Sequence, residues 1–179
     1  GLLKKAYADV CEEGLDIVMP EIGVMSEVPS AVYQARAIAK RVDFLSVGSN
    51  DLTQYILAVD RNNSRVANLF DSLHPAMLQA LLQVVAGGHQ EGKKVSICGE
   101  LAGDPVAVLL LVAMGFDSLS MSASSLSRMK WVIRQFTKKK ACKLLQDVLG
   151  MESTIMIRCH MELALEQVGL GGLIRAGKK

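Results

Sequence analysis

The segment VDFLSVGSND, residues 42–51, carries the clearest fold signal in this 179-residue chain. Its apolar run, residues 42–48, has the length and the Val, Leu and Phe content of a buried β-strand. Asn50 and Asp51 then predict the start of a short helix that runs through Ala58. A strand followed at once by a helix is the unit from which parallel α/β folds are built.

The same order of strand and helix repeats on both sides of this segment. Apolar runs predict strands over residues 22–25, 42–48, 95–98 and 118–121. Apolar spacing of three to four residues, with Pro75 and Asp104-Pro105 as start signals, predicts helices over residues 2–13, 30–40, 50–58, 75–90, 104–114 and 126–136. Residues 61–74 predict a long loop. Four βα units in order predict a parallel sheet with covering helices, so the fold class is α/β.

Beyond Lys138 the pattern is helical only. One apolar stripe includes Leu144 and Val148, and another lies within residues 155–168. Residues 169–179 are rich in glycine and basic side chains, and we expect them to be mobile. The sequence therefore predicts a βα domain, residues 1–137, followed by a helical extension, residues 138–179.

The composition excludes several classes of protein. Half of the residues are hydrophobic, which excludes a disordered chain. The formal net charge of +2 and the aromatic content of 4% argue against a nucleic-acid binder. No apolar run of about 18 residues predicts a membrane span, and no secretory leader is evident. Four cysteines without CxxC pairs or zinc spacing are typical of reduced thiols, so we expect a cytoplasmic protein.

Polar side chains follow each predicted strand at the point where it ends. They are Glu27 after the first strand, Asn50 and Asp51 after the second, Cys98 and Glu100 at the third, and Ser122 and Ser124 after the fourth. Parallel α/β proteins bind ligands at the carboxyl ends of their strands. Neighbouring strands lie about 4.8 Å apart, so Glu27 and Asp51 would converge if their strands are neighbours. Two carboxylates without histidine or cysteine ligands suit Mg²⁺, which predicts a metal-assisted site for phosphoryl or enolate chemistry.

Each of these residues also has a purely structural interpretation. Asp51 could cap the helix that follows it, a role that does not exclude metal binding. Glu27 and Arg61 could be ordinary loop residues, and Cys98 could be an inert buried thiol. The three histidines lack any partner pattern and are interpreted as structural or surface residues: His74, His89 and His160.

A near match to a phosphate-binding P-loop, GLIRAGK at residues 172–178, is rejected. It lacks the Ser or Thr that should follow the lysine, and no predicted strand precedes it. The segment therefore does not predict nucleotide binding.

Several segments, taken together, resemble the phosphoenolpyruvate-utilising enzymes, and most closely enzyme I of the bacterial phosphotransferase system. The resemblance runs in order over residues 1–136. It rests on GVMSEVP (23–29), SVGSNDLTQY (46–55), AVDRNN (58–63), CGELAGD (98–104) and SMSA (120–123). The tail GLGGLIR (169–175) resembles the nitrogen-related paralogue of enzyme I.

The resemblance implies a (β/α)₈ barrel that binds phosphoenolpyruvate (PEP) and Mg²⁺ at its carboxyl face. By matching position, Glu27 and Asp51 would be the Mg²⁺ ligands. Asn50, Asp51 and Arg61 would contact PEP, and Cys98 would be the general acid that protonates the enolate to pyruvate. In the family, the phosphate passes to a histidine on a separate domain and then to a histidine-containing phosphocarrier protein.

The chain supplies four of the eight strands of such a barrel, which typically has about 250 residues. It matches the second half, so we expect half of a (β/α)₈ TIM barrel with a helical extension. The phosphate-holding arginines and the phosphohistidine motif of the family have no counterpart here. We therefore expect a fragment with little turnover alone, and a homodimer that covers the exposed strand edges, with no nucleic-acid or membrane partner.

Two other functions stay open at this point. The chain could be a non-catalytic dimerisation and binding module that has inherited the strand-end residues. It could also be part of an ATP-dependent PEP synthase or pyruvate phosphate dikinase, because these enzymes share the NDLTQ and cysteine segments. The Leu101-Ala102 form of the cysteine segment and the helical tail favour enzyme I.

Overall fold

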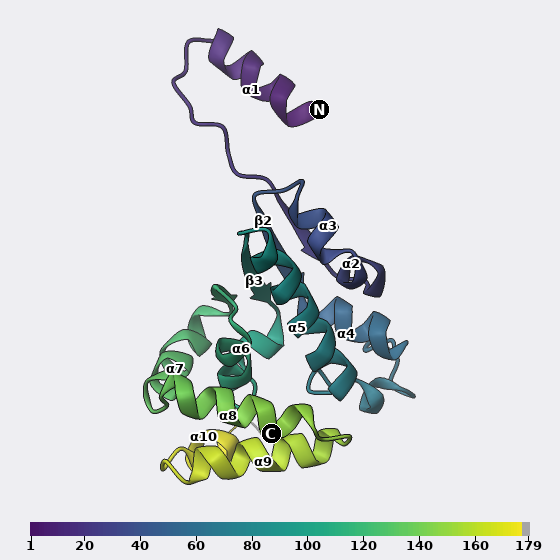
Figure 1. Ribbon diagram of the computed structural model, residues 1–179, viewed down its shortest axis with the longest axis vertical. Helices are drawn as coiled ribbons and strands as arrows, with labels where there is room; N and C mark the ends of the chain where they lie inside the picture. Colours follow the sequence, from purple (N-terminus) through teal and green to yellow (C-terminus); the bar gives the residue numbers. More distant parts are fainter. Residues whose placement is uncertain (177–179) are drawn as a thin grey trace.

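The computed structural model describes the backbone of residues 1–176, and it contains one sheet of four parallel strands (Figure 1). The strands are β1 (Gly23–Ser26), β2 (Phe44–Gly48), β3 (Lys94–Cys98) and β4 (Ser118–Ser120). Their order in the sheet is the order in the chain, and every neighbouring pair is parallel. The predicted α/β fold is confirmed, and the arrangement is that of half a (β/α)₈ barrel with additional helices.

Helices connect the strands and continue after the last one. Those of the sheet region are α1 (Leu2–Glu12), α2 (Pro29–Tyr33), α3 (Ala35–Ala39), α4 (Ser49–Leu57), α5 (Pro75–Gln90), α6 (Val108–Met114) and α7 (Ala123–Arg134), with the 3₁₀ turns η1 (Ala67–Leu69) and η2 (Glu100–Gly103). The extension consists of α8 (Lys138–Leu149), α9 (Thr154–Glu166) and α10 (Gly171–Ala176). The predicted helix over residues 75–90 is confirmed at both ends.

Four predictions about helices need correction. The helix expected over residues 126–136 is α7, which begins three residues earlier, at Ala123, and ends at Arg134. The single helix expected over residues 30–40 is divided into α2 and α3 at Gln34, whose ψ of 8° interrupts the helix where α3 approaches Gly87 of α5 closely. The helix expected from Asp104 begins at Val108, and residues 105–107 form a turn in which the Asp104 carboxylate accepts the N–H of Val106. Residues Gly171–Ala176, expected in a mobile tail, form α10; residues 177–179 lie outside the described residues.

The two faces of the sheet differ in burial. The face under the helices is buried, and its positions are Leu45 and Val47 in β2 and Val95 and Ile97 in β3. Helix α5 packs against these two strands. The register aligns the alternate positions in one row on the opposite face: Met25, Ser46, Ser96 and Ser118. Small polar side chains thus occupy much of the face that would lie inside a closed barrel.

The extension shares the core of the sheet region. Helix α8 packs against α6, and α9 and α10 pack against each other. Ile157, Met161 and Leu165 of α9 are completely buried, and they belong to the same apolar cluster as the strand residues. In Figure 1 these helices lie together below the sheet, at the lower edge of the view.

The amino-terminal segment, in contrast, projects from the rest of the molecule (Figure 1). No residue of α1 is buried, and Leu2 and Val18 are the most exposed large apolar side chains of the described residues. The outer strands β1 and β4 each pair on one side only. No helix in residues 1–176 combines the length and the apolar character that a membrane crossing requires.

Asp117 stabilises the amino ends of β3 and β4. Its carboxylate accepts the N–H of Val95 at 2.8 Å and lies 3.0 Å from Nε2 of His89. The hydrogen bond from the Val95 N–H is the main cause that holds the pKa of the Asp117 carboxyl below its usual value. His89 lowers this pKa further. This cluster lies at the opposite end of the strands from Glu27 and Cys98.

Candidate active site at the carboxyl ends of the strands

The segment after β1, which contains Glu27, meets the segment after β2 at the carboxyl end of β2. Gly48 closes β2, and Glu27 follows β1 one residue beyond the pair Ser26–Val47. A Cβ atom on Gly48 would lie 2.7 Å from Oε1 of Glu27, so the Glu27 carboxylate lies directly over this glycine. The absence of a side chain at residue 48 therefore makes room for the carboxylate from the neighbouring strand.

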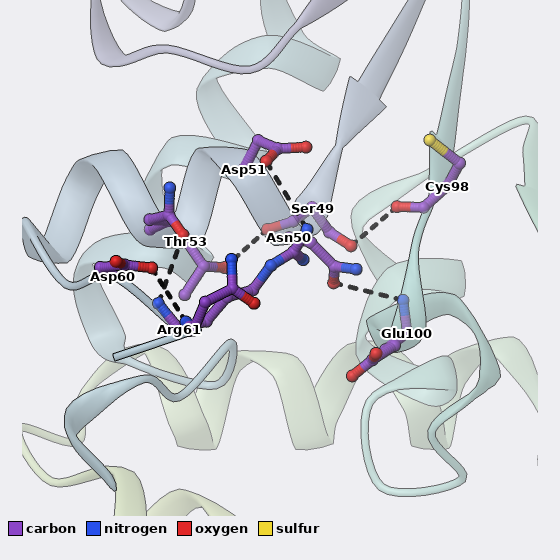
Figure 2. A network of polar contacts seen from close by, with 10 residues as sticks. Ser49, Asn50, Asp51, Thr53, Asp60, Arg61, Cys98 and Glu100 are labelled. Carbon is purple, nitrogen blue, oxygen red and sulfur yellow. Dashed lines mark hydrogen bonds and ion pairs between the residues drawn. The ribbon is translucent and has the colours of Figure 1, made fainter. Parts of the chain in front are cut away.

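Ser49 and Asn50 join this edge to the end of β3 (Figure 2). Ser49 is fully buried, and its hydroxyl donates to the carbonyl oxygen of Cys98 at 2.7 Å. The side-chain oxygen of Asn50 accepts the backbone N–H of Glu100 at 3.4 Å. Gly99 lies between these contacts with φ of +107°, and a Cβ there would collide with the Ser49 hydroxyl. The Asn50 amide is thus oriented by the segment that follows Cys98.

Asp51 and Arg61 form an open ion pair beside this turn. Oδ1 of Asp51 lies 3.8 Å from Nη2 of Arg61, and the two side chains are 43% and 36% exposed. The backbone N–H of Arg61 donates to the side chain of Gln54 in α4. The N-cap residue of α4 is Gly48, so the interpretation of Asp51 as the helix cap is wrong. Both charged groups are accessible to a ligand.

Cys98 lies beside a cavity of about 420 Å³. Its thiol lies 3.5 Å from the carbonyl oxygen of Val47, which makes at most a weak hydrogen bond. The cavity is also lined by Asn50 and Glu100 and by residues after β4: Met121, Ser122 and Ser125. Cys98 is half-buried and faces an open space, which is the placement that a proton donor to a bound substrate requires.

The two carboxylates at this edge are of the kind that Mg²⁺ prefers. Among the side chains that the structure describes, no three histidine, cysteine, aspartate or glutamate residues gather as a metal-binding group. Glu27 and Asp51 both lie at the carboxyl end of β2, one over Gly48 and the other in the first turn of α4. Mg²⁺ typically takes one or two protein carboxylates and fills its other positions with water and substrate phosphate.

The structure adds residues that the sequence analysis did not select. Ser49 and Gly99 shape the site, and Met121 and Ser125 line its cavity. For Gly99 the sequence did contain a signal, a glycine directly after Cys98, because glycine readily adopts left-handed backbone conformations. The histidines take part in contacts elsewhere: His74 caps α5, His89 contacts Asp117, and His160 contacts Asp147. The segment resembling a P-loop follows helix α9 rather than a strand.

Comparisons with known proteins identify the family of this chain. The family described as PEP-utilising enzyme, PEP-binding domain, matches residues 2–138. A protein of Escherichia coli named "Phosphoenolpyruvate-dependent phosphotransferase system" is 47% identical over 177 residues, which are 98% of this chain and 24% of that protein. A "Phosphoenolpyruvate-protein phosphotransferase" of Haemophilus influenzae is 50% identical over 134 residues, 75% of this chain and 23% of that protein.

The chain thus spans about a quarter of the length of these relatives. The matched residues include the whole sheet and all the strand-end side chains described above. The chain belongs to the PEP-binding domain family of the PEP-utilising enzymes.

Proposed function

We propose that this chain binds PEP together with Mg²⁺ at the carboxyl edge of its sheet, as the second half of the PEP-binding barrel of a PEP-protein phosphotransferase. The observation that carries the proposal is the grouping of Glu27, Asp51 and Cys98 on adjacent strand ends in a chain of this family. The names of the relatives favour the phosphotransferase over a dikinase. Two relatives that align over 98% of the chain include the helical extension. The assignment to the nitrogen-related paralogue rests on the tail GLGGLIR (169–175).

Glu27 and Asp51 would hold the Mg²⁺ ion, which supplies Lewis-acid stabilisation of the enolate oxygen. Arg61 presents forked donors that match a carboxylate or phosphate group. The Asn50 amide, held by the Glu100 N–H, offers its NH₂ group to the same anion. These three kinds of contact neutralise and orient a small, highly charged substrate.

Cys98 would complete the reaction. The phosphoryl group leaves the enol oxygen of PEP for a histidine outside this chain, and from there it passes to the phosphocarrier protein. The enolate carbon then takes the thiol proton of Cys98, forming a C–H bond, and the resulting thiolate regains a proton from water. We expect the isolated chain to bind substrate with little turnover, and the whole protein to act in the cytoplasm.

Calorimetric titration with oxalate, a planar dianion similar to the enolate of pyruvate, tests the proposal in the presence of Mg²⁺. Asp51→Asn keeps the shape of the side chain and removes a metal ligand, so we expect at least about a tenfold loss of affinity. Asp9→Ala removes an exposed carboxylate in α1 and should bind as the unmodified chain does. Equal affinity for Asp51→Asn, or no Mg²⁺-dependent binding by the unmodified chain, would favour the non-catalytic module.

A homodimer is the second part of the proposal. The unpaired edges of β1 and β4 and the exposed apolar side chains of residues 2–22 support it. Light scattering coupled to size-exclusion chromatography should give twice the mass of the chain. A stable monomer at micromolar concentration would contradict the dimer and leave the binding proposal untouched.

A further inference from the structure

A second cavity, of about 550 Å³, lies between the sheet region and the extension. Glu100 and Gly103 line both this cavity and the one beside Cys98, so the turn η2 forms the wall between them. Asp71, Asp104 and Arg158 also line the larger cavity. Arg158 lies on α9 of the extension, and its side chain contacts the loop that follows α4 and the loop that follows η2.

The guanidinium of Arg158 contacts one carboxylate from each loop. Nη2 lies 3.5 Å from Oδ1 of Asp71, and Nη1 lies 3.7 Å from Oδ2 of Asp104. Asp71 belongs to the long loop after α4, which also carries Arg61. Asp104 follows η2, which begins two residues after Cys98. One side chain thus connects the loop of the substrate-binding arginine with the loop of the proton donor.

Both carboxylates are themselves held in position. Oδ1 of Asp71 accepts the backbone N–H of Leu73 at 2.9 Å, and Oδ1 of Asp104 accepts that of Val106 at 2.9 Å. A displacement of either carboxylate therefore shifts the backbone of its loop. In addition, Thr53 of α4 approaches the Ser72 hydroxyl at 3.3 Å, next to Asp71.

The helix that carries Arg158 is anchored in the apolar core. Ile157 and Met161, on either side of Arg158 in α9, are completely buried. The family match ends at residue 138, so this helix lies outside the matched residues. It is present in the part of the chain that aligns with the Escherichia coli relative.

We propose that Arg158 is a positioning residue that fixes the loop of Arg61 (residues 58–74) relative to the loop after Cys98 (residues 99–107). In this way it couples the helical extension to the substrate site. This inference rests on the proposed function for its effect on ligand affinity. The coupling between the loops is a property of the chain itself, and it can be measured without ligand.

Three variants separate positioning from general stability. Arg158→Met removes the charge and keeps most of the apolar stem, and Arg158→Lys restores a positive charge that can contact one carboxylate. Arg36→Met is the control, because it removes an exposed arginine in α3 from its 2.6 Å ion pair with Glu91, away from the carboxyl ends of the strands. Hydrogen exchange of residues 58–74 and 99–107 and oxalate titration with Mg²⁺ are measured on all three.

Arg158→Met should exchange faster than the unmodified chain in both segments and bind oxalate roughly three to ten times more weakly. Arg158→Lys should recover part of each effect, and Arg36→Met should change neither. Unchanged exchange in the two segments for Arg158→Met, or equal acceleration in Arg36→Met, would overturn the inference. Should the unmodified chain fail to bind oxalate, the exchange result still decides whether Arg158 couples the loops.

Discussion

The helices α1 and α8 are similar in length, with 11 and 12 residues, and each carries apolar side chains on one side. Their surroundings differ completely. No residue of α1 is buried, but four residues of α8 are: Ala141, Leu144, Leu145 and Val148. Helix α8 packs against α6, whose apolar sequence VLLLVAM offers a matching surface. An amphipathic pattern therefore determines that a helix forms, and the burial of that helix depends on a second apolar surface supplied by the fold.

The largest effect expected from this contrast is on stability. Leu165 of α9 is completely buried in the shared core, so Leu165→Ala should lower the free energy of unfolding by about 2–5 kcal/mol. Leu3 of α1 is 41% exposed, and Leu3→Ala should stay within about 0.5 kcal/mol of the unmodified chain. Urea unfolding followed by circular dichroism measures both changes.

The shape of the unfolding curve sharpens this comparison. Because the extension and the sheet share one apolar cluster, Leu165→Ala should shift a single transition. A separate early transition, with the remaining transition at its original midpoint, would contradict a common core. It would show instead that the extension unfolds as an independent unit.

A smaller effect is expected at two buried serines. Ser26 lies in β1, the strand that continues from the amino-terminal segment, and its buried hydroxyl has no hydrogen-bond partner among the described residues. Ser49 directly follows β2, as the first residue of α4, and donates to the Cys98 carbonyl at the end of β3. Ser49→Ala should therefore cost about 1–3 kcal/mol, and Ser26→Ala should leave stability equal or higher.

Thermal unfolding of the two variants, measured side by side, tests this expectation. Each substitution removes one hydroxyl from a buried position, so Ser26→Ala serves as the control for Ser49→Ala. Equal losses in the two variants would mean that the Ser49–Cys98 contact contributes nothing specific to joining β2 and β3.

Local patterns were sufficient for most of the fold. The order of strands and helices follows from apolar spacing and start signals, and Pro75 marked the beginning of α5 correctly. The division at Gln34 has no local signal in the sequence, and the close approach of α3 to Gly87 joins segments about 50 residues apart in the chain. The glycine-rich composition of residues 169–179 likewise favoured a mobile tail, although Leu170 is buried and α10 packs against α9.

For the candidate site, the sequence by itself determined which polar residues stand at the ends of strands, because strand ends and polar residues are both local features. Only the tertiary structure decided which of them meet. The Glu27 carboxylate lies over Gly48 because β1 and β2 are neighbours in a defined register. Arg158 reaches Asp71 across 87 residues because α9 packs below the sheet. Such contacts depend on packing between distant segments, and no short window of sequence contains both partners.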